Sequence, residues 1–313
     1  MNRILVIRGG AIGDLILTLP ALKALRDTRP EAHMEILGYQ HIAVLAENRF
    51  YAQAVRSIEY GPLARFFARS SELPAELADH FASFDLIVSY LYDPDRIFET
   101  NLRRCGVENL IRGPARIVEN AHHAARQLAR PIEQLGINVV DLSERIFLST
   151  EDREFAHEFL APMPQPIIAI HPGSGSNQKN WPLENWIGLF SPDNHFADLA
   201  RLLVISGEAD QAQTKQLEHE WKNRDVHFAK NLPLPQLAAL LENAIFIGHD
   251  SGISHLAAAA GSNCILLFGP TNPNVWAPEN DNVRVLTSPT GRLGDLGIEM
   301  VERVFAATFS EFG

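Results

Sequence analysis

Small and polar residues that could hold a phosphate or a sugar gather in four loops, each directly after an expected strand. These loops cover residues 9–14, 171–180, 206–210 and 248–252. In open parallel sheets, ligands bind beyond the carboxyl ends of the strands. We therefore expect the four loops to converge on one cleft between two domains.

The loop at 248–252 reads Gly-His-Asp-Ser-Gly and precedes an alanine-rich segment. Asp250 or Ser251 can cap this helix, whose free N–H groups and positive dipole end suit a phosphate or a sugar hydroxyl. His255 follows Ser251 by four residues, so the two side chains share one helix face. The alternative is a capped helix packed on a buried strand, with His255 an ordinary core histidine.

The loop at 171–180 combines residue types that suit a diphosphate. It supplies two glycines for close backbone approach, two hydroxyl groups and a point charge: Gly173, Gly175, Ser174, Ser176 and Lys179. Because the residue after Lys179 is an asparagine, the loop lacks the GxxxxGK[ST] spacing that is typical of ATPases. The alternative is a surface loop with a solvated lysine.

Three carboxylates accompany these loops. Asp14 follows a glycine turn at the start of a helix, where it can cap the helix or take a proton from an incoming hydroxyl. Glu208 and Asp210 can accept hydrogen bonds from a ribose diol, or form the acidic first turn of the next helix. The turn GGAIGD lacks the GxGxxG spacing, which disfavours a dinucleotide oxidoreductase.

Strands and helices alternate along the whole chain, which predicts an α/β protein with mostly parallel sheets covered on both faces. Pro20 lies within the helical pattern 15–26 and predicts a local irregularity there. Three prolines between 162 and 166 form a stiff connector, so we expect domains at 1–160 and 161–313. The expected strands are 3–8, 34–37, 55–58, 86–90, 109–111, 146–148, 167–170, 202–205, 226–228, 244–247, 264–268 and 283–286.

The composition is that of a globular protein, with 46% hydrophobic and 21% charged residues in a chain of 313. The net charge of -11 is concentrated after residue 150, which disfavours nucleic acid as a partner. No apolar run reaches the ~18 residues of a transmembrane segment, and the N-terminus does not resemble a signal peptide. Two cysteines without metal-ligand spacing fit a reducing compartment, so we expect a cytoplasmic protein without a bound metal.

Three stretches together resemble glycosyltransferase family 9, the lipopolysaccharide heptosyltransferases and their relatives. They are RILVIRGGAIGDLILTLPALKALR, HPGSGSNQKNWP and IGHDSGISHLAAAAGSNCILLFGPTNPNVWAP. The resemblance implies a GT-B architecture, in which two Rossmann-like domains flank a cleft and the last helix returns to the first domain. It also implies an inverting transfer from an ADP-linked heptose that needs neither metal nor cofactor.

The resemblance also implies roles for individual residues. Asp14 matches the proposed general base, and Lys179 the lysine beside the nucleotide phosphates, where it assists catalysis. The implied donor-binding residues are Ser174, Ser176, Lys179, Asp250, Ser251, Gly252 and His255, with Glu208 chosen for the ribose and Asp210 as its alternative. The role of His249, which precedes the motif, is left open.

The first half of the chain is rich in arginine, which binds phosphates and carboxylates through paired N–H groups. If the acceptor is a lipopolysaccharide inner core, the candidate contacts are Gly13, Arg65, Arg69, Arg103, Arg104, Arg112 and Arg116. With a lipid acceptor we expect peripheral contact with the inner membrane, where Phe66 and Phe67 could touch its surface. The alternatives are a solvated basic face and core aromatics.

Two other functions fit the same stretches. One is a transferase of this fold that uses another nucleotide sugar or acceptor. The other is a protein that binds a nucleotide sugar without turnover.

Overall fold

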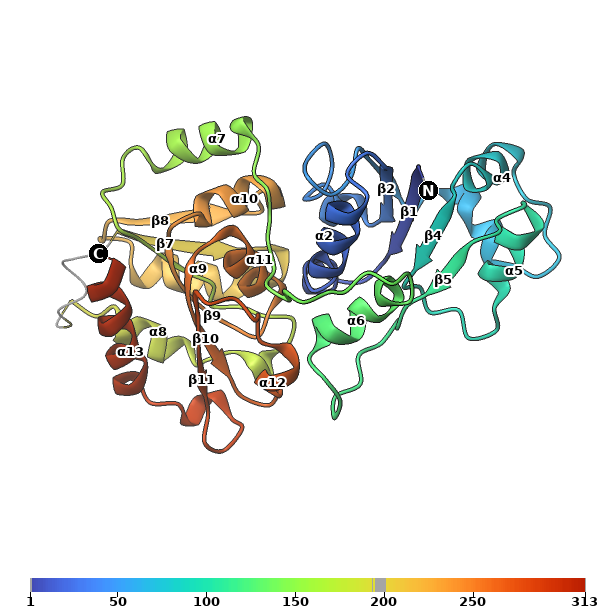
Figure 1. Cartoon of the computed structure of the whole chain (residues 1–313). Helices are drawn as coiled ribbons and strands as arrows, with labels where there is room; N and C mark the ends of the chain where they lie inside the picture. Colours follow the sequence, from blue (N-terminus) through green and yellow to red (C-terminus); the bar gives the residue numbers. More distant parts are fainter. Residues whose placement is uncertain (1, 193, 195–200, 313) are drawn as a thin grey trace. The chain divides into compact units, whose positions relative to one another are not determined.

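The computed structural model describes residues 2–192, 194 and 201–312. The chain divides into two compact units, Met1–Leu142 and Ser143–Gly313, each built on a parallel sheet with helices around it (Figure 1). The division therefore falls between Leu142 and Ser143, whereas the prolines had suggested a boundary after residue 160.

The first unit has a five-stranded sheet in the order β3-β2-β1-β4-β5. All neighbours are parallel, as the alternating pattern predicts. The strands are β1 Arg3–Arg8, β2 His33–Gly38, β3 Ala54–Ser57, β4 Leu86–Ser89 and β5 Leu110–Arg112. Because β1 lies between β2 and β4, the strand order reverses beside β1, and the loop after β1 lies where ligands bind in such sheets.

The helical elements of the first unit are α1 Ile12–Ile16, α2 Leu19–Thr28, α3 Gln40–Ala43, η1 Gly61–Phe67, α4 Ala75–Ala82, α5 Ile97–Arg104 and α6 Ala124–Glu133. The irregularity predicted from Pro20 is a break between α1 and α2. Pro20 occupies the first turn of α2, where its missing N–H breaks no helical hydrogen bond.

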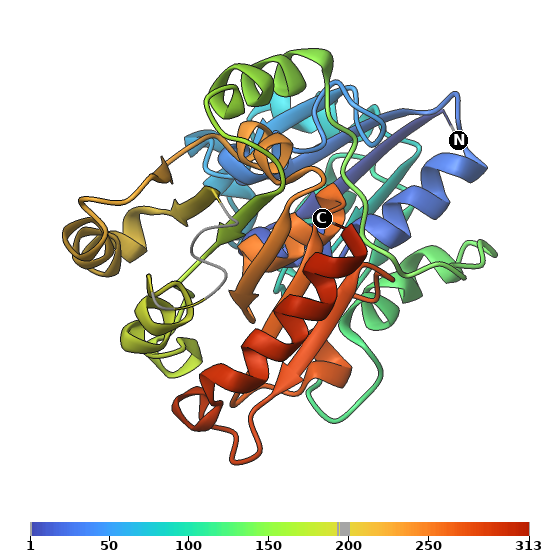
Figure 2. The same cartoon turned by 90° about the vertical axis from the view of Figure 1, so that its left-hand side faces the viewer.

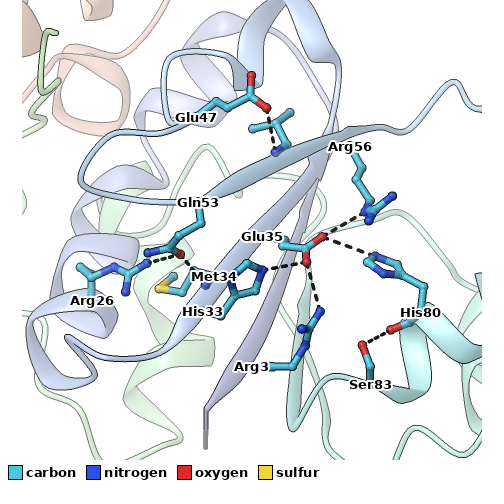
Figure 3. Close-up of polar contacts among 11 residues, drawn as sticks. Arg3, Arg26, His33, Met34, Glu35, Glu47, Gln53, Arg56, His80 and Ser83 are labelled. Carbon is cyan, nitrogen blue, oxygen red and sulfur yellow. Dashed lines mark hydrogen bonds and ion pairs between the residues drawn. The ribbon is translucent and has the colours of Figure 1, made fainter.

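A buried carboxylate lies within the sheet of the first unit, on β2. Glu35 is 3% exposed, and it is surrounded by Arg3, Arg56, His33 and His80 (Figure 3). Arg56 Nε donates to Oε2 at 3.0 Å, and His33 Nε2 lies 2.9 Å from Oε1. These partners compensate the cost of burying the charge.

The second unit has a six-stranded parallel sheet in the order β11-β10-β9-β6-β7-β8. The strands are β6 Ile167–Ile170, β7 Arg201–Ser206, β8 Val226–Lys230, β9 Ile245–His249, β10 Asn263–Phe268 and β11 Val283–Thr287. Here the strand order reverses between β6 and β9. The loops after these two strands therefore flank the crevice where ligands bind in such sheets.

The helical elements of the second unit are α7 Thr150–Leu160, η2 Asn177–Lys179, α8 Leu183–Leu189, η3 Glu208–Asp210, α9 Gln211–Glu220, α10 Leu234–Leu241, α11 Gly252–Ala260, α12 Pro273–Trp276, η4 Leu293–Asp295 and α13 Ile298–Phe312. Val301 and Phe305 of α13 are fully buried with Trp186 of α8 in the core of this unit. Figure 2 shows α13, in red, lying along the strands of the second sheet. The last helix thus packs in the core of the second unit, although the resemblance implied a return to the first domain.

The segment before the prolines also belongs to the second unit. Helix α7 packs against α10 (Figure 1). Its start is capped by Ser149, whose hydroxyl accepts from Asp152 N while the Asp152 carboxylate accepts from Ser149 N. The expected strand at 146–148 does not form, and Ile146 N instead donates to Ala259 O of α11.

Candidate active site

Three of the four predicted loops meet at the carboxyl ends of β6, β7 and β9 in the second unit. Hydrogen bonds join the loop at 171–180 to the loop at 248–252 and to the loop at 206–210. This part of the predicted convergence is confirmed. The fourth loop, at 9–14, belongs to the first unit.

Lys179 and Asp250 form an ion pair between two of these loops. Lys179 Nζ lies 2.6 Å from Asp250 Oδ2, and the lysine side chain is 31% exposed against 11% for the aspartate. Asp250 directly precedes the cap of α11, so the pair holds the ammonium group near the start of that helix. An ammonium group has three N–H donors. The geometry leaves two of them for a ligand such as a phosphate.

Helix α11 begins as the sequence predicts, with Ser251 as its cap. Ser251 Oγ accepts from Ser254 N at 3.3 Å. Ser254 is buried, and its hydroxyl donates to His249 O, which ties the helix to the end of β9. Gly252 is the first residue of the helix. The N–H groups of this first turn are not all used within the helix, so they can bind an anion.

His255 lies in the second turn of α11 and pairs with a residue that the sequence did not indicate. Its Nδ1 is 2.7 Å from Oε1 of Glu144, and both side chains are buried. Glu144 lies 111 residues earlier in the chain. A single acid in a coil segment carries no local pattern, so sequence reasoning had no signal for it.

His249, whose role the sequence left open, is fully buried between the loops. Its Nε2 accepts from the Trp181 N–H at 2.9 Å, and its Nδ1 lies 3.4 Å from Gly173 O. Burial lowers the pKa of His249 to about 3, so the ring is neutral at physiological pH. Because Nε2 accepts, the proton is on Nδ1 and donates to Gly173 O. His249 therefore fastens the loop at 171–180 to the end of β9.

Asp210 is buried and already paired within the protein, so Glu208 is the better candidate for a contact with a ligand. Asp210 is 5% exposed, and its Oδ2 lies 3.0 Å from His171 Nε2 and accepts from Gly207 N. Burial by itself raises the pKa of Asp210, but the hydrogen bond and charge of His171 and the Gly207 N–H outweigh it and lower the pKa. Glu208 is exposed on the same loop.

The two serines of the loop at 171–180 organise the loop itself. Ser174 Oγ lies 2.8 Å from Ser176 O and 2.6 Å from Asn180 Oδ1. Ser176 Oγ accepts from Gln178 N at the start of η2. Gly175 and Ser176 are exposed. The loop therefore presents backbone and hydroxyl groups to solvent while its shape is fixed from within.

Asp14 is the central candidate of the first unit. Arg8 Nη2 donates to Asp14 Oδ1 at 2.9 Å, and Ala11 N donates to Oδ2 at 2.8 Å. Gly10 has φ 102°, and a Cβ there would lie 2.5 Å from Asp14 Oδ2. The side chain of Asp14 remains 35% exposed. The glycine turn thus makes room for a carboxylate that is held from one side and open on another.

Arg8 is itself held in place within the first unit. It is 6% exposed, its Nε donates to Asp14 O and to Thr18 Oγ1, and its guanidinium lies over the Tyr90 ring. Burial lowers the pKa of Arg8, while Asp14 opposes this effect. Gly13, a candidate acceptor contact, is half-buried in α1 beside Asp14.

The structure brings together two of the candidate arginines of the first unit. Arg69 and Arg104 line a cavity of about 480 Å³ with Asp95, Thr100 and Asn101 among its walls. The other candidate arginines contact nearby chain segments. Arg65 donates to Glu72 O, Arg103 to Val107 O and Arg112 to Asp93 O, and Arg116 lies over the Tyr92 ring.

The two candidate aromatics differ. Phe66 is fully buried in the core of the first unit, so the expectation that it touches a membrane is wrong. Phe67 is 43% exposed and stacks on Phe98.

None of the helices in the described ranges combines the length and apolar character needed to cross a bilayer. Among the same residues, no three His, Cys, Asp or Glu groups lie close enough to hold a metal ion.

The fold is that of the GT-B glycosyltransferases. A glycosyl transferase of family 9 from Veillonella parvula superposes with a TM-score of 0.82 at 18% identity, covering 99% of this chain and 97% of that one. ADP-heptose lipopolysaccharide heptosyltransferase II of Escherichia coli superposes with a TM-score of 0.79 at 14% identity, covering 99% of both chains. In sequence, lipopolysaccharide heptosyltransferase 3 of Escherichia coli is 24% identical over 87% of this chain and 84% of its own length.

The family model described as "Glycosyltransferase family 9 (heptosyltransferase)" matches residues 110–303. The chain belongs to this family and is a glycosyltransferase.

Proposed function

We propose that this protein transfers a heptose from ADP-heptose to the inner core of lipopolysaccharide, with inversion at the anomeric carbon. The observation that carries the proposal is the Lys179–Asp250 pair at the capped start of α11. It combines a cation with free helix N–H groups, as the diphosphate of a nucleotide sugar requires. The names of the similar Escherichia coli proteins supply the sugar and the acceptor.

On the donor side, the second unit binds ADP-heptose. The diphosphate lies against Lys179 and the first turn of α11, with Ser174 and Ser176 in the loop that covers it. Glu208 accepts from the ribose hydroxyls, because it is exposed whereas Asp210 is buried on His171. Asp250 acts by orienting Lys179, and His255 contacts the donor from the face that it shares with Ser251.

On the acceptor side, Asp14 is the general base. It removes the proton of the acceptor hydroxyl as the oxygen forms its bond to the anomeric carbon. The bond from that carbon to the phosphate oxygen breaks, and ADP leaves with the electron pair. Lys179 and the N–H groups of α11 stabilise the charge that develops on the diphosphate. Arg69 and Arg104, which line one cavity, bind anionic groups of the acceptor.

The test is a donor screen in which ADP-heptose, UDP-glucose and GDP-mannose are each incubated with a lipopolysaccharide acceptor extract. We expect the acceptor mass to increase by one heptose residue with ADP-heptose alone, and NMR to show an inverted linkage. Transfer only from another nucleotide sugar would replace the donor assignment. Binding of ADP without any turnover would favour a nucleotide-sugar-binding protein. Comparing intact with dephosphorylated acceptor then measures the contribution of the arginines.

A further inference from the structure

Glu144 is a buried carboxylate whose partner belongs to the proposed donor site. It is 1% exposed, and its Oε1 lies 2.7 Å from His255 Nδ1. Among the described residues, Oε2 of Glu144 has no hydrogen-bond partner. Burying a carboxylate with one oxygen unpaired is costly. The hydrogen bond to His255 is therefore the main polar contact that orients the Glu144 side chain.

The backbone around Glu144 is anchored without help from its side chain. Glu144 N donates to Asn280 Oδ1 at 2.9 Å, and Asn280 Nδ2 donates to Glu144 O at 2.9 Å. Ile146 N donates to Ala259 O at the end of α11. These bonds fix the segment that follows the division between the units. Changes to the Glu144 side chain can thus be separated from changes to the segment.

The hydrogen bond determines which ring nitrogen of His255 carries the proton. An ionised carboxylate only accepts, so Nδ1 is the donor in this contact. Nε2 lies on the opposite edge of the ring, and its direction is fixed once Nδ1 is held. His255 shares a helix face with Ser251, the cap of α11. Glu144 therefore fixes the orientation of the His255 ring, which lies next to the start of α11.

We propose that Glu144 is a positioning residue of the donor site, which holds the His255 ring, protonated on Nδ1, in the orientation needed to contact the nucleotide-sugar donor. This inference rests on the proposed function for the identity of the donor. It assigns a role to a residue outside the three stretches that mark the family.

The first experiment measures ADP binding by calorimetry in Glu144→Met, Glu144→Gln and the wild type. Methionine has a similar length and no acceptor for Nδ1, so we expect binding to weaken about tenfold. Glutamine can still accept through its amide oxygen, so we expect binding within about threefold of the wild type. In transfer assays, Glu144→Met should raise the KM for the donor and leave the KM for the acceptor unchanged.

The matched control is Asn280→Ala, which removes both hydrogen bonds to the Glu144 backbone and leaves the side chains of Glu144 and His255 unchanged. We expect this variant to bind ADP as the wild type does, with melting temperatures confirming that all variants are folded. Wild-type affinity in Glu144→Met would overturn the inference. Equal losses in Asn280→Ala and Glu144→Met would also overturn it, because they would show that Glu144 only anchors the segment.

A second readout does not depend on the donor. Long-range ¹H–¹⁵N spectra of ¹⁵N-histidine-labelled protein report which ring nitrogen is protonated, and His255→Gln assigns the signal. We expect a protonated Nδ1 in the wild type and in Glu144→Gln, and a changed signal in Glu144→Met. A bare Nδ1 in the wild type would overturn the inference. If the wild type binds ADP but transfers no sugar, the proposed function fails while this inference stands on its binding and spectral data.

Discussion

At the scale of single residues, Asp14 shows how one carboxylate can be both held and available. Arg8 and the Ala11 N–H each engage one of its oxygens, yet the side chain is one-third exposed. Each carboxylate oxygen can accept more than one hydrogen bond. A substrate hydroxyl can therefore donate to Asp14 without breaking the contact with Arg8.

Asp14→Asn tests the general base. The amide keeps an acceptor for Arg8 but cannot take up a proton, so we expect kcat to fall by ~10² or more with nearly unchanged ADP binding. Asp27→Asn removes an exposed carboxylate from α2 of the same unit and should leave kcat as in the wild type. Unchanged turnover in a folded Asp14→Asn protein would remove Asp14 from the chemistry.

Lys179 and Asp250 have different roles that two substitutions can separate. Lys179→Met removes the charge at the start of α11, so we expect ADP binding to weaken about tenfold or more and kcat to fall. Asp250→Asn leaves the lysine charged but loosens its position, which predicts a smaller loss. Lys222→Met, an exposed change just after α9, is the charge control. The assignment fails if Asp250→Asn is more damaging to ADP binding than Lys179→Met.

At the scale of elements, two glycines of one loop have different reasons to be glycine. A Cβ on Gly173 would lie 1.8 Å from Asp210 Oδ1, whereas a Cβ on Gly175 would meet nothing within 4 Å. The sequence had suggested that both allow a phosphate to approach the backbone. The structure explains Gly173 by the packing of Asp210, which reaches it from the neighbouring loop.

The pair Gly173→Ala and Gly175→Ala tests at which of the two positions packing requires a glycine. We expect Gly173→Ala to displace Asp210 and to destabilise the second unit by about 1–3 kcal/mol, because the methyl group overfills a packed site. Gly175→Ala should unfold at the wild-type temperature, since its methyl group enters open space. Thermal unfolding followed by circular dichroism measures both. Equal melting temperatures for the two variants would contradict the packing explanation.

The sequence predicted elements well where the pattern is local. β1 and β6 have the bounds expected from their apolar runs, and the break before Pro20 follows from proline chemistry. Sequence patterns did not predict the features that depend on contacts between residues far apart in the chain. The prolines at 162–166 mark a connection inside the second unit, because α7 packs on α10. The pairs His171–Asp210 and Glu144–His255 likewise join residues that no local spacing relates.

At the scale of the whole molecule, the stability of the first unit should depend on pH through the Glu35 cluster, which consists of Glu35 and its partners Arg3, His33, Arg56 and His80. Burial by itself raises the pKa of Glu35, but hydrogen bonds from His33 and Arg56 and the charges of His80 and Arg56 outweigh it, so the net pKa is lowered. Burial and Arg56 lower the pKa of His80, whose charge therefore acts on Glu35 only in acid. Both pKa shifts favour the protonation states present at neutral pH, which are an ionised Glu35 and a neutral His80.

Acid should therefore destabilise the first unit in two steps. A group whose pKa is lowered by folding contributes stability above its unfolded pKa and loses that contribution as the pH falls through its folded pKa. The loss from His80 begins below its ordinary value of 6.5, and the loss from Glu35 begins below its ordinary value of 4.5. Hydrogen exchange of the amides of β2, measured from pH 7 to about 3, follows the unit that contains the cluster.

Glu35→Gln tests this dependence. At pH 7 the variant leaves Arg3 and Arg56 without their carboxylate, so we expect a loss of about 2 kcal/mol in the opening free energy of β2. The difference from the wild type should shrink as the pH falls below the folded pKa of Glu35, because the wild-type carboxylate is then neutral as well. Glu31→Gln removes an exposed carboxylate just before the same strand and should follow the wild type at every pH. Parallel curves for Glu35→Gln and the wild type from pH 7 to 3 would show that the cluster does not set the acid stability of this unit.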